Sequence, residues 1–310
     1  MGEIFAGQKT KKDVILFQLR LADNLANLYH SLANYTYKHG LYSAFTVSDP
    51  KLRNIHKAAV RDRVLHHLIH KELYPYFDKK FIYDSYSCRK NKGTLRAINR
   101  FKYFAGRVSK NNSRMCYVLK CDIKKFFASI NHKILIKILK RHIEDTDIIW
   151  LIDEIISSFY STRPGVGLPL GNLTSQLFVN VYMNEFDQFV KHELKIKYYI
   201  RYADDFVVLS DDKKWLEKQI FVIQGFLFKE LKLELHPDKV SIKTLASGVD
   251  FLGWVNFPYH RVLRTTTKRR MLRRIVKSLA PETLNSYLGL LRHGNTGKLQ
   301  KEVYERIKIL

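Results

Sequence analysis

The chain has 310 residues, 46% of them hydrophobic, which is enough to bury a sizeable core and to form two or three subdomains. Its 54 lysines and arginines outnumber 29 aspartates and glutamates, and the net charge of +25 favours nucleic acid as partner, with an anionic membrane surface as the rival. No segment approaches the roughly 20 apolar residues of a membrane span, and no apolar leader precedes the first charges, so we expect a cytoplasmic protein that does not enter a membrane.

The N-terminal third is predicted to be mainly helical. Apolar residues recur every three to four positions over residues 16–37, which indicates one amphipathic helix. A second helix is predicted over residues 57–71, followed by Pro75 and a polar, basic loop. A third is predicted over residues 95–107.

The centre of the chain changes period. A strand is predicted over residues 115–123, and helices follow over 132–141, 148–160 and 174–194. Two apolar segments flank a short acidic turn within residues 197–210, and a helix over 215–231 and strands over 240–244 and 250–257 come next. This β-α-β-β-α-β order predicts an α+β, ferredoxin-like unit, and the chain from residue 261 onward is predicted to be basic and helical.

Three aspartates are the strongest candidates for chemistry. Asp204 and Asp205 form the acidic turn, and Asp122 ends the first central strand. An exposed acidic turn is common in hairpins and is the simpler interpretation of the pair alone. A ferredoxin-like sheet would bring Asp122 beside that turn, and three converging carboxylates suit Mg²⁺, as two ions, with Mn²⁺ as a substitute. The reaction class that follows is phosphoryl transfer to a primer hydroxyl.

Six blocks resemble the motifs of reverse transcriptases, in the family's order. YADDF at residues 202–206 resembles the catalytic turn, and CDIKKFFASINH at 121–132 resembles the segment of the first aspartate. Further matches are GLPLGNLTSQLFVNVYMNEFD, LHPDKVSI with GVDFLGW, and the finger-like RDRVLHHLI and DSYSCRKNKGTLRAI. The family implies a right-hand polymerase with a ferredoxin-like palm, helical fingers and a short helical thumb.

The resemblance implies three regions. Residues 1–114 would form the fingers, residues 115–256 the palm with finger-side helices inserted at about 132–165, and residues 257–310 the thumb.

Within the family, the chain is similar to reverse transcriptases of diversity-generating retroelements, which are related to the group II intron enzymes. Leu170 replaces a glutamine and Gln176 a proline of the intron-type pattern, and SYLGLLRHGNT at 286–296 adds to the likeness. This subtype copies a template RNA with errors at adenines, so the implied partners are template RNA, an RNA–DNA hybrid, deoxynucleoside triphosphates and a small basic accessory protein oligomer. Another bacterial reverse transcriptase, intron-like or phage-defence, and a non-catalytic RNA-binding scaffold are the alternatives.

The resemblance also implies roles for single residues. Asp122, Asp204 and Asp205 would hold the metals, with the Ile123 carbonyl as a further ligand, and Lys239 would protonate the leaving pyrophosphate. Phe127 would be the steric gate against ribonucleotides, unless it simply packs in the core in place of Phe126. Candidates for the triphosphate are the basic residues Arg53, Arg63, Arg89 and Lys90, any of which could instead be a solvated charge.

Two more groups complete the prediction. Leu170, Gly171 and Gln176 would lie by the templating pair, where leucine removes a polar contact and should weaken discrimination between nucleotides. A basic helical segment would follow the phosphates of the hybrid, although a solvated helix face is the simpler interpretation; its residues are Arg264, Lys268, Arg269, Arg270, Arg273 and Arg274.

Other metal and thiol chemistry is not expected. His66 and His70 have a zinc-compatible spacing, but no third ligand is near, so a structural role is favoured. Cys88, Cys116 and Cys121 fit no zinc pattern and are predicted to be reduced thiols.

Overall fold

The computed structural model describes residues 11–48, 52–277 and 280–309. The chain divides into two compact units, each built from distant stretches of sequence. The first contains Met1–Ile82, Ile123–Glu193 and Gln224–Glu234, and the second contains Tyr83–Asp122, Leu194–Ile223 and Leu235–Leu310. The predicted ranges of fingers, palm and thumb stay a prediction. In the part of the chain described, no helix is long and apolar enough to cross a membrane.

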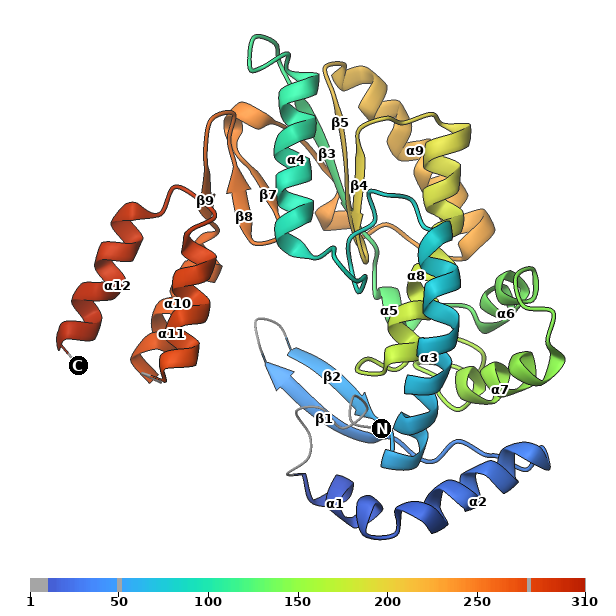
Figure 1. Ribbon diagram of the computed structural model, residues 1–310. Coiled ribbons are helices and arrows are strands. Elements are labelled where there is room, and N and C mark those ends of the chain that lie inside the picture. The colour runs from blue at the N-terminus through green and yellow to red at the C-terminus, as the bar shows by residue number, and fades with distance from the viewer. Residues whose placement is uncertain (1–10, 49–51, 278–279, 310) are drawn as a thin grey trace. The chain divides into compact units, whose positions relative to one another are not determined.

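The second unit is organised around a four-stranded sheet (Figure 1). Its strands are β3 (Tyr117–Asp122), β4 (Tyr199–Tyr202), β5 (Asp205–Ser210) and β6 (Ser241–Thr244), and every neighbouring pair is antiparallel. The order across the sheet is β4-β5-β3-β6, so the first strand in sequence lies between the last two. This is the order of a ferredoxin-like sheet, and the predicted α+β class is confirmed.

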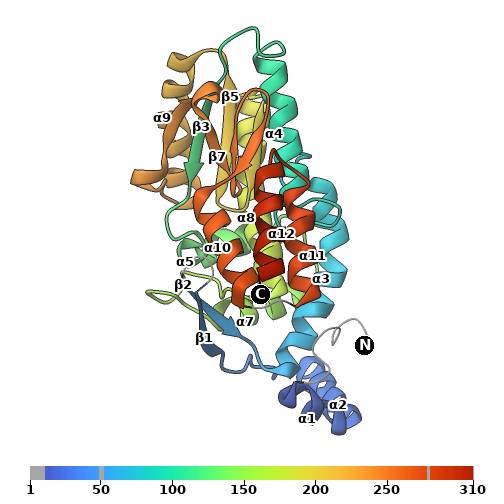
Figure 2. The same cartoon turned by 90° about the vertical axis from the view of Figure 1, so that its left-hand side faces the viewer.

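Apolar side chains on one face of this sheet pack against helix α4 (Thr94–Val108). Phe101, Phe104 and Ala105 of the helix meet Val118 of β3 and Val207 of β5, all nearly free of solvent contact. Helix α9 (Lys213–Leu231) begins on the opposite side of the sheet, as Figures 1 and 2 show together. Because both faces are covered, the strands read as continuous apolar runs, and this explains why they could be predicted.

A second, three-stranded sheet follows in the same unit, formed by β7 (Val249–Phe251), β8 (Trp254–Asn256) and β9 (Arg261–Leu263). Two predictions were wrong here. Residues 250–257 form a hairpin and not one strand, because Leu252 and Gly253 both adopt positive φ (51° and 85°) and reverse the chain. The predicted helix does not start at Arg261, because that residue pairs with Asn256 as the start of β9.

Helices α10 (Thr265–Lys277), α11 (Pro281–Leu291) and α12 (Gly297–Ile309) close the second unit around Trp254. The sequence over residues 261–279 predicts an apolar stripe formed by Met271, Leu272, Ile275, Val276 and Leu279, and the structure buries part of it. Met271 and Ile275 are buried, whereas Val276 is 47% exposed, and Leu279 lies outside the described residues.

The first unit is mainly helical. Residues 16–37 were predicted as one helix, but the chain breaks at Arg20 into α1 (Lys12–Leu19) and α2 (Leu21–Ala33). The remaining helices are α3 (Val60–Lys80), α5 (Phe126–Ser129), α6 (His132–Lys140), α7 (Thr146–Ser157) and α8 (Leu173–Gln188), with a π-helical turn, η1 (Phe189–Glu193).

Helix α3 begins later and runs further than predicted. Pro75 lies inside it, although proline in a helix interior costs about 3 kcal/mol. Leu73, Tyr74 and Phe77 around it are buried, and α3 packs against α8, so tertiary packing offsets the lost hydrogen bond.

The sequence predicted no strand in the N-terminal third, but the structure has two, just before helix α3. β1 (Ser43–Ser48) and β2 (Leu52–Lys57) form an antiparallel hairpin, and every residue of β1 is exposed. With no buried face, the hairpin leaves no alternating apolar pattern in the sequence, which is why it was missed.

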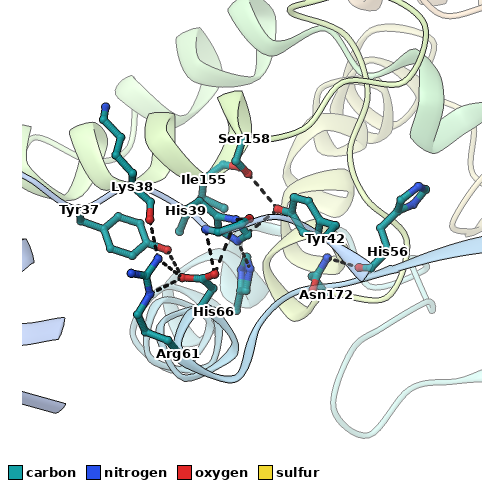
Figure 3. A network of polar contacts seen from close by, with 12 residues as sticks. Tyr37, Lys38, His39, Tyr42, His56, Arg61, His66, Ile155, Ser158 and Asn172 are labelled. Atoms are coloured by element: carbon teal, nitrogen blue, oxygen red, sulfur yellow. Dashed lines mark hydrogen bonds and ion pairs between the residues drawn. The ribbon is translucent and has the colours of Figure 1, made fainter. Parts of the chain in front are cut away.

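A buried polar network in the first unit surrounds Asp62 of α3, whose side chain is fully buried (Figure 3). It links the segment after α2 with α3 and α8. The carboxylate accepts hydrogen bonds from Tyr37 Oη (2.9 Å), the Gly40 amide (3.0 Å) and Arg61 Nε (2.9 Å).

The network continues through two histidines. His39 Nε2 lies 3.1 Å from His66 Nε2, and His66 Nδ1 lies 2.7 Å from the hydroxyl of Thr174 on α8. His66 thus has polar partners at both ring nitrogens, and His70 stacks on Tyr74 with ring centroids 5.1 Å apart. Both contacts agree with the structural role favoured for this pair.

Candidate active site

Asp122 and Asp205 face each other across two hydrogen-bonded strands. Asp122 is the last residue of β3 and Asp205 the first of β5, and the antiparallel register pairs them directly. Directly opposed residues have Cα atoms about 4.5–5.5 Å apart and project to the same face of the sheet. The spatial demand made by the sequence, that the lone acid meet the tandem acids, is therefore met.

The turn between β4 and β5 holds the third carboxylate. Tyr202 pairs with Asp205, so Ala203 and Asp204 form a two-residue hairpin turn. Ala203 has a φ of 55°, a left-handed conformation that costs about 1 kcal/mol for a residue other than glycine. The strain is held in place by the paired strands on either side, and it fixes the carboxylates that follow.

Burial and neighbouring negative charge disfavour the ionised form of Asp205. Burial raises the pKa of Asp205 to about 6, Lys120 opposes the rise, and the carboxylates of Asp204 and Asp122 add to it. A hydrogen bond between Asp122 and Asp205 contributes to the same shift. Such a site gains stability from a cation placed between its oxygens.

The carboxylates of this site fit a Mg²⁺ ion that is coordinated partly by the protein and partly by the substrate. Among the described residues, no three His, Cys, Asp or Glu side chains enclose a metal by themselves. Mg²⁺ is usually held by one or two carboxylates together with substrate phosphates and water, rather than by an all-protein cage. Asp122 and Asp205, with Asp204 in the adjoining turn, present carboxylate oxygens of the type that Mg²⁺ prefers.

Lys239 belongs to this site. It ends the short 3₁₀ helix η2 (Pro237–Lys239), and its ammonium donates to Asp122 Oδ1 at 2.7 Å. The same loop is fixed by its backbone, since the His236 amide donates to the Asp122 carbonyl at 2.8 Å. Its proposed role toward pyrophosphate stays a prediction, but the lysine lies where it can act on groups bound at Asp122.

Arg89 and Lys90 also belong to the second unit, on a loop fastened to β4. Ser85 forms a parallel bridge with Arg201 of β4, and the Tyr86 amide donates to the Arg201 carbonyl at 3.0 Å. Arg89 Nη1 donates to the Ser85 carbonyl at 3.0 Å, while Lys90 is exposed. The structure thus ties this basic loop to the strand that leads into the acidic turn.

Arg201 is a site-supporting residue that the sequence reasoning missed. Its side chain is fully buried, and its guanidinium donates to the Ala203 carbonyl (3.2 Å) and to Ser85 Oγ (3.0 Å). It therefore connects the acidic turn with the basic loop. The signal was present, because an arginine inside the apolar run YYIRY must find buried acceptors.

Seven of the predicted site residues lie in the first unit: Arg53, Arg63, Ile123, Phe127, Leu170, Gly171 and Gln176. Ile123 is buried, and Phe126 fills the core while the adjacent Phe127 is half-buried, so Phe127 is the more accessible phenylalanine of the two.

Leu170 and Gly171 lie against strand β2. The Leu170 carbonyl accepts from the His56 amide at 2.9 Å, and Gly171 touches Ile55 so closely that a Cβ would lie 2.8 Å from its Cγ2 atom. Arg53 is exposed on the same strand, so the structure brings these three residues to one edge of the hairpin. Gln176 lies half-buried in the first turn of α8.

Arg63 takes part in an ion pair within the first unit. It pairs with Asp13 at 2.8 Å, and Lys57 contacts the same carboxylate oxygen at 2.6 Å. Its charge is already compensated within the first unit, which weakens its case as a triphosphate ligand.

The basic residues of α10, with Arg264 just before the helix, divide into two groups. Arg264 pairs with Asp250 (3.1 Å) and Lys268 with Glu302 (3.0 Å), so both help to hold the helix in place. Arg269 and Arg273 line a shallow apolar hollow with Leu272 and Val276, and Arg274 is exposed and Arg270 half-buried.

The cysteines are free thiols, as predicted. Cys88 is exposed, while Cys116 and Cys121 are buried. Burial raises the pKa of Cys121, which keeps it protonated as a core residue beside Asp122.

Comparison with known proteins agrees with this geometry. Residues 45–255 match the model of the family described as reverse transcriptase (RNA-dependent DNA polymerase). The protein YkfC of Escherichia coli K12 is 25% identical over 79% of this chain and 71% of its own length. The group II intron-encoded protein LtrA of Lactococcus lactis is 24% identical over 43% of this chain and 33% of its own length.

Solved structures agree on the fold. Telomerase from Candida albicans, in complex with a fragment of telomeric RNA, superposes with a TM-score of 0.59 at 11% identity, covering 88% of this chain and 54% of that one. Apo telomerase from Candida tropicalis gives 0.55 at 12% identity, covering 71% and 48%. The chain spans about half the length of these telomerases. Since the family model covers most of the chain, including the acidic turn and the strand opposite it, this chain belongs to the reverse transcriptase (RNA-dependent DNA polymerase) family.

Proposed function

We propose that this protein copies an RNA template into DNA by extending a primer with deoxynucleoside triphosphates. The observation that carries the proposal is the direct cross-strand pairing of Asp122 with Asp205, with Asp204 in the adjoining turn. Members of the family generally use divalent metal ions. Bound Mg²⁺ would supply activation of the primer hydroxyl and charge compensation for the leaving pyrophosphate.

The chain's own residues would do the rest. Asp122, Asp204 and Asp205 would hold the cations, with the Ile123 carbonyl beside them, and Lys239 at 2.7 Å from Asp122 would offer a proton to the leaving group. Arg89 and Lys90 would bind the triphosphate from the loop attached to β4. The basic α10 residues would follow the hybrid's phosphates.

The experiment is primer extension on a defined RNA template with Mg²⁺. Asp204→Asn should abolish extension, while Asp23→Asn, an exposed acid on α2, should extend like wild type. A non-catalytic RNA-binding scaffold predicts no extension by wild type and no difference among the three proteins, and that result would overturn the proposal.

We further propose that the enzyme serves a diversity-generating retroelement, with errors at template adenines and a small basic accessory protein oligomer as partner. The support is Leu170 and Gln176, which depart from the intron-type pattern, and the docking of Leu170 against β2 in the first unit. The similarity to intron-encoded proteins favours the alternative, an intron-like enzyme. Sequencing cDNA made from a defined RNA separates the two, because errors without enrichment at adenines would contradict the retroelement assignment.

A further inference from the structure

A cavity of about 420 Å³ lies in the second unit, away from the aspartates. Its floor includes Phe101 and Ala105 of α4 together with Leu245, and its walls come from residues 256–261 between β8 and β9 and from residues 292–295 between α11 and α12. The Leu245 amide donates to the carbonyl of Cys116, the residue before β3. Asp122 ends that strand six residues later, which places the cavity about 20 Å from the acids at the opposite end of β3.

The lining is cationic and contains no acid. Lys102, Arg261 and Arg292 contribute to it, and so do His260 and His293, whereas no aspartate or glutamate does. Among the described residues, no carboxylate pairs with any of these three Lys and Arg side chains. Lys102 and Arg292 are exposed and Arg261 is half-buried, so solvent screens much of their mutual repulsion, and an anion bound among them would gain from all three charges.

Arg261 shows the imbalance most clearly. Its Nε donates to the His293 carbonyl and its Nη2 to Asn99 Oδ1 at 2.9 Å, and both acceptors are neutral. Its Nη1 is buried and has no acceptor among the described residues. The guanidinium also lies over the Trp254 ring, 5.6 Å from its centroid. Buried donors of charged groups are normally satisfied, so the fold keeps one N–H group of this cation without an acceptor at the cavity.

The segment that carries Arg292 and His293 is held rigidly. The Asn295 amide donates to the Arg261 carbonyl at 2.8 Å, and a Cβ on Gly294 would overlap the Trp254 ring. Residues 292–296 lie in the RHGNT stretch, to which the proposed polymerase chemistry gives no role. A rigid loop at a cationic cavity is preorganised for binding.

Aromatic groups accompany the cations. Phe257 and His260 stack with ring centroids 4.9 Å apart, and Tyr259 beside them is 79% exposed at the mouth. An exposed aromatic next to uncompensated cations suits a ligand with a flat ring and a phosphate.

We propose that this cavity is a second nucleotide-binding site, which takes the phosphate of a nucleotide at Lys102 and Arg292 and its base at Tyr259. The choice of a nucleotide over other phosphate carriers rests on the proposed function, while the anion site itself does not. The ligand is either a free nucleotide or a nucleotide unit of an RNA strand, because both present the same chemistry.

The test compares Lys102→Gln/Arg292→Gln with Lys214→Gln/Lys218→Gln, which removes two exposed charges from α9 instead. AMP is titrated into each protein in EDTA, so that binding through metal at the aspartates is excluded, and a single-stranded oligo(A) RNA is titrated separately. The pocket variant should bind at least tenfold more weakly than the control. Its slope of log affinity against log salt should be shallower by about 0.7 for RNA, the value for one lost phosphate contact on a single strand. Tyr259→Ala should weaken binding about tenfold, and Tyr160→Ala, also exposed, should not.

The two arms identify the source. Loss confined to AMP assigns a free nucleotide, and loss of RNA affinity assigns the RNA strand. If the pocket and control variants bind both ligands equally, the site does not exist. Primer extension on a generic template should stay within about twofold of wild type in the pocket variant. If extension is intact and neither ligand is affected, the pocket fails while the polymerase assignment stands.

Discussion

Arg201 places a buried guanidinium two residues before the turn that carries Asp204. Its donors satisfy the Ala203 carbonyl and Ser85 Oγ, so the side chain holds a left-handed alanine in place while it fastens the basic loop to β4. Replacing it leaves those acceptors buried and unmet, at a cost of about 1–3 kcal/mol for each.

We therefore expect Arg201→Met to lower the free energy of unfolding by about 2–4 kcal/mol in urea titrations. Arg107→Met, at an exposed position of α4, should change it by less than about 0.5 kcal/mol. Equal stability of the two variants would show that the buried guanidinium does not support the turn.

Leu170 offers a test of fidelity at a single side chain. Its backbone is fixed by the hydrogen bond from His56, so Leu170→Gln changes the side chain with little movement of the chain. One restored polar contact is worth about 1–3 kcal/mol, so misincorporation should fall by about tenfold in cDNA sequencing. Unchanged error rates would contradict a fidelity role for this position.

At the scale of elements, the loop before α8 depends on glycine at position 171. Gly171 has a φ of 112°, and an added Cβ would meet Ile55 on β2. Gly171→Ala should lower the free energy of unfolding by about 1–3 kcal/mol. Gly225→Ala is the matched control, because nothing lies near that position in α9 and alanine should stabilise the helix by up to about 1 kcal/mol. Thermal unfolding of both variants measures this difference, and equal melting temperatures would contradict the need for glycine at position 171.

The elements also show what the sequence could and could not predict. β3, β4 and β5 are buried on both faces, so their apolar runs predicted them, and with them the meeting of Asp122 and Asp205. The β1–β2 hairpin has no buried face, and β9 is only three residues long, so neither leaves a periodic signal. Pro75 signals a helix end, but packing against α8 overrides it.

At the scale of the whole molecule, the network around Asp62 should make stability depend on pH. Burial lowers the pKa of His66 to about 3, and the positive charges of His39 and His67 oppose its protonation while Asp62 favours it. An unfolded histidine has a pKa near 6.5, so between these values the unfolded chain binds the extra proton. The contribution of neutral His66 to the free energy of unfolding is therefore fully present above pH 6.5 and is lost as the pH falls toward 3.

The expected loss from this one group between pH 7 and pH 5 is about 2 kcal/mol of unfolding free energy. His66→Gln should remove about that much of the difference in urea titrations at the two pH values. His30→Gln, at an exposed position on α2, should retain the wild-type difference. An unaltered pH dependence in His66→Gln would show that His66 is protonated in the folded protein.

We propose that Asp122 and Asp205, paired across β3 and β5, act as one unit in nucleotide transfer. When two groups act as a unit, replacing either one removes most of the rate enhancement, so the effects of the two substitutions on the rate are not additive in free energy. The most direct measurement is the single-turnover rate of nucleotide incorporation on an RNA template for Asp122→Asn, Asp205→Asn and the double variant. We predict that each single change slows incorporation at least about 1000-fold and that the double variant is less than about tenfold slower still. Losses that multiply in the double variant, or a single variant that incorporates at the wild-type rate, would contradict the account.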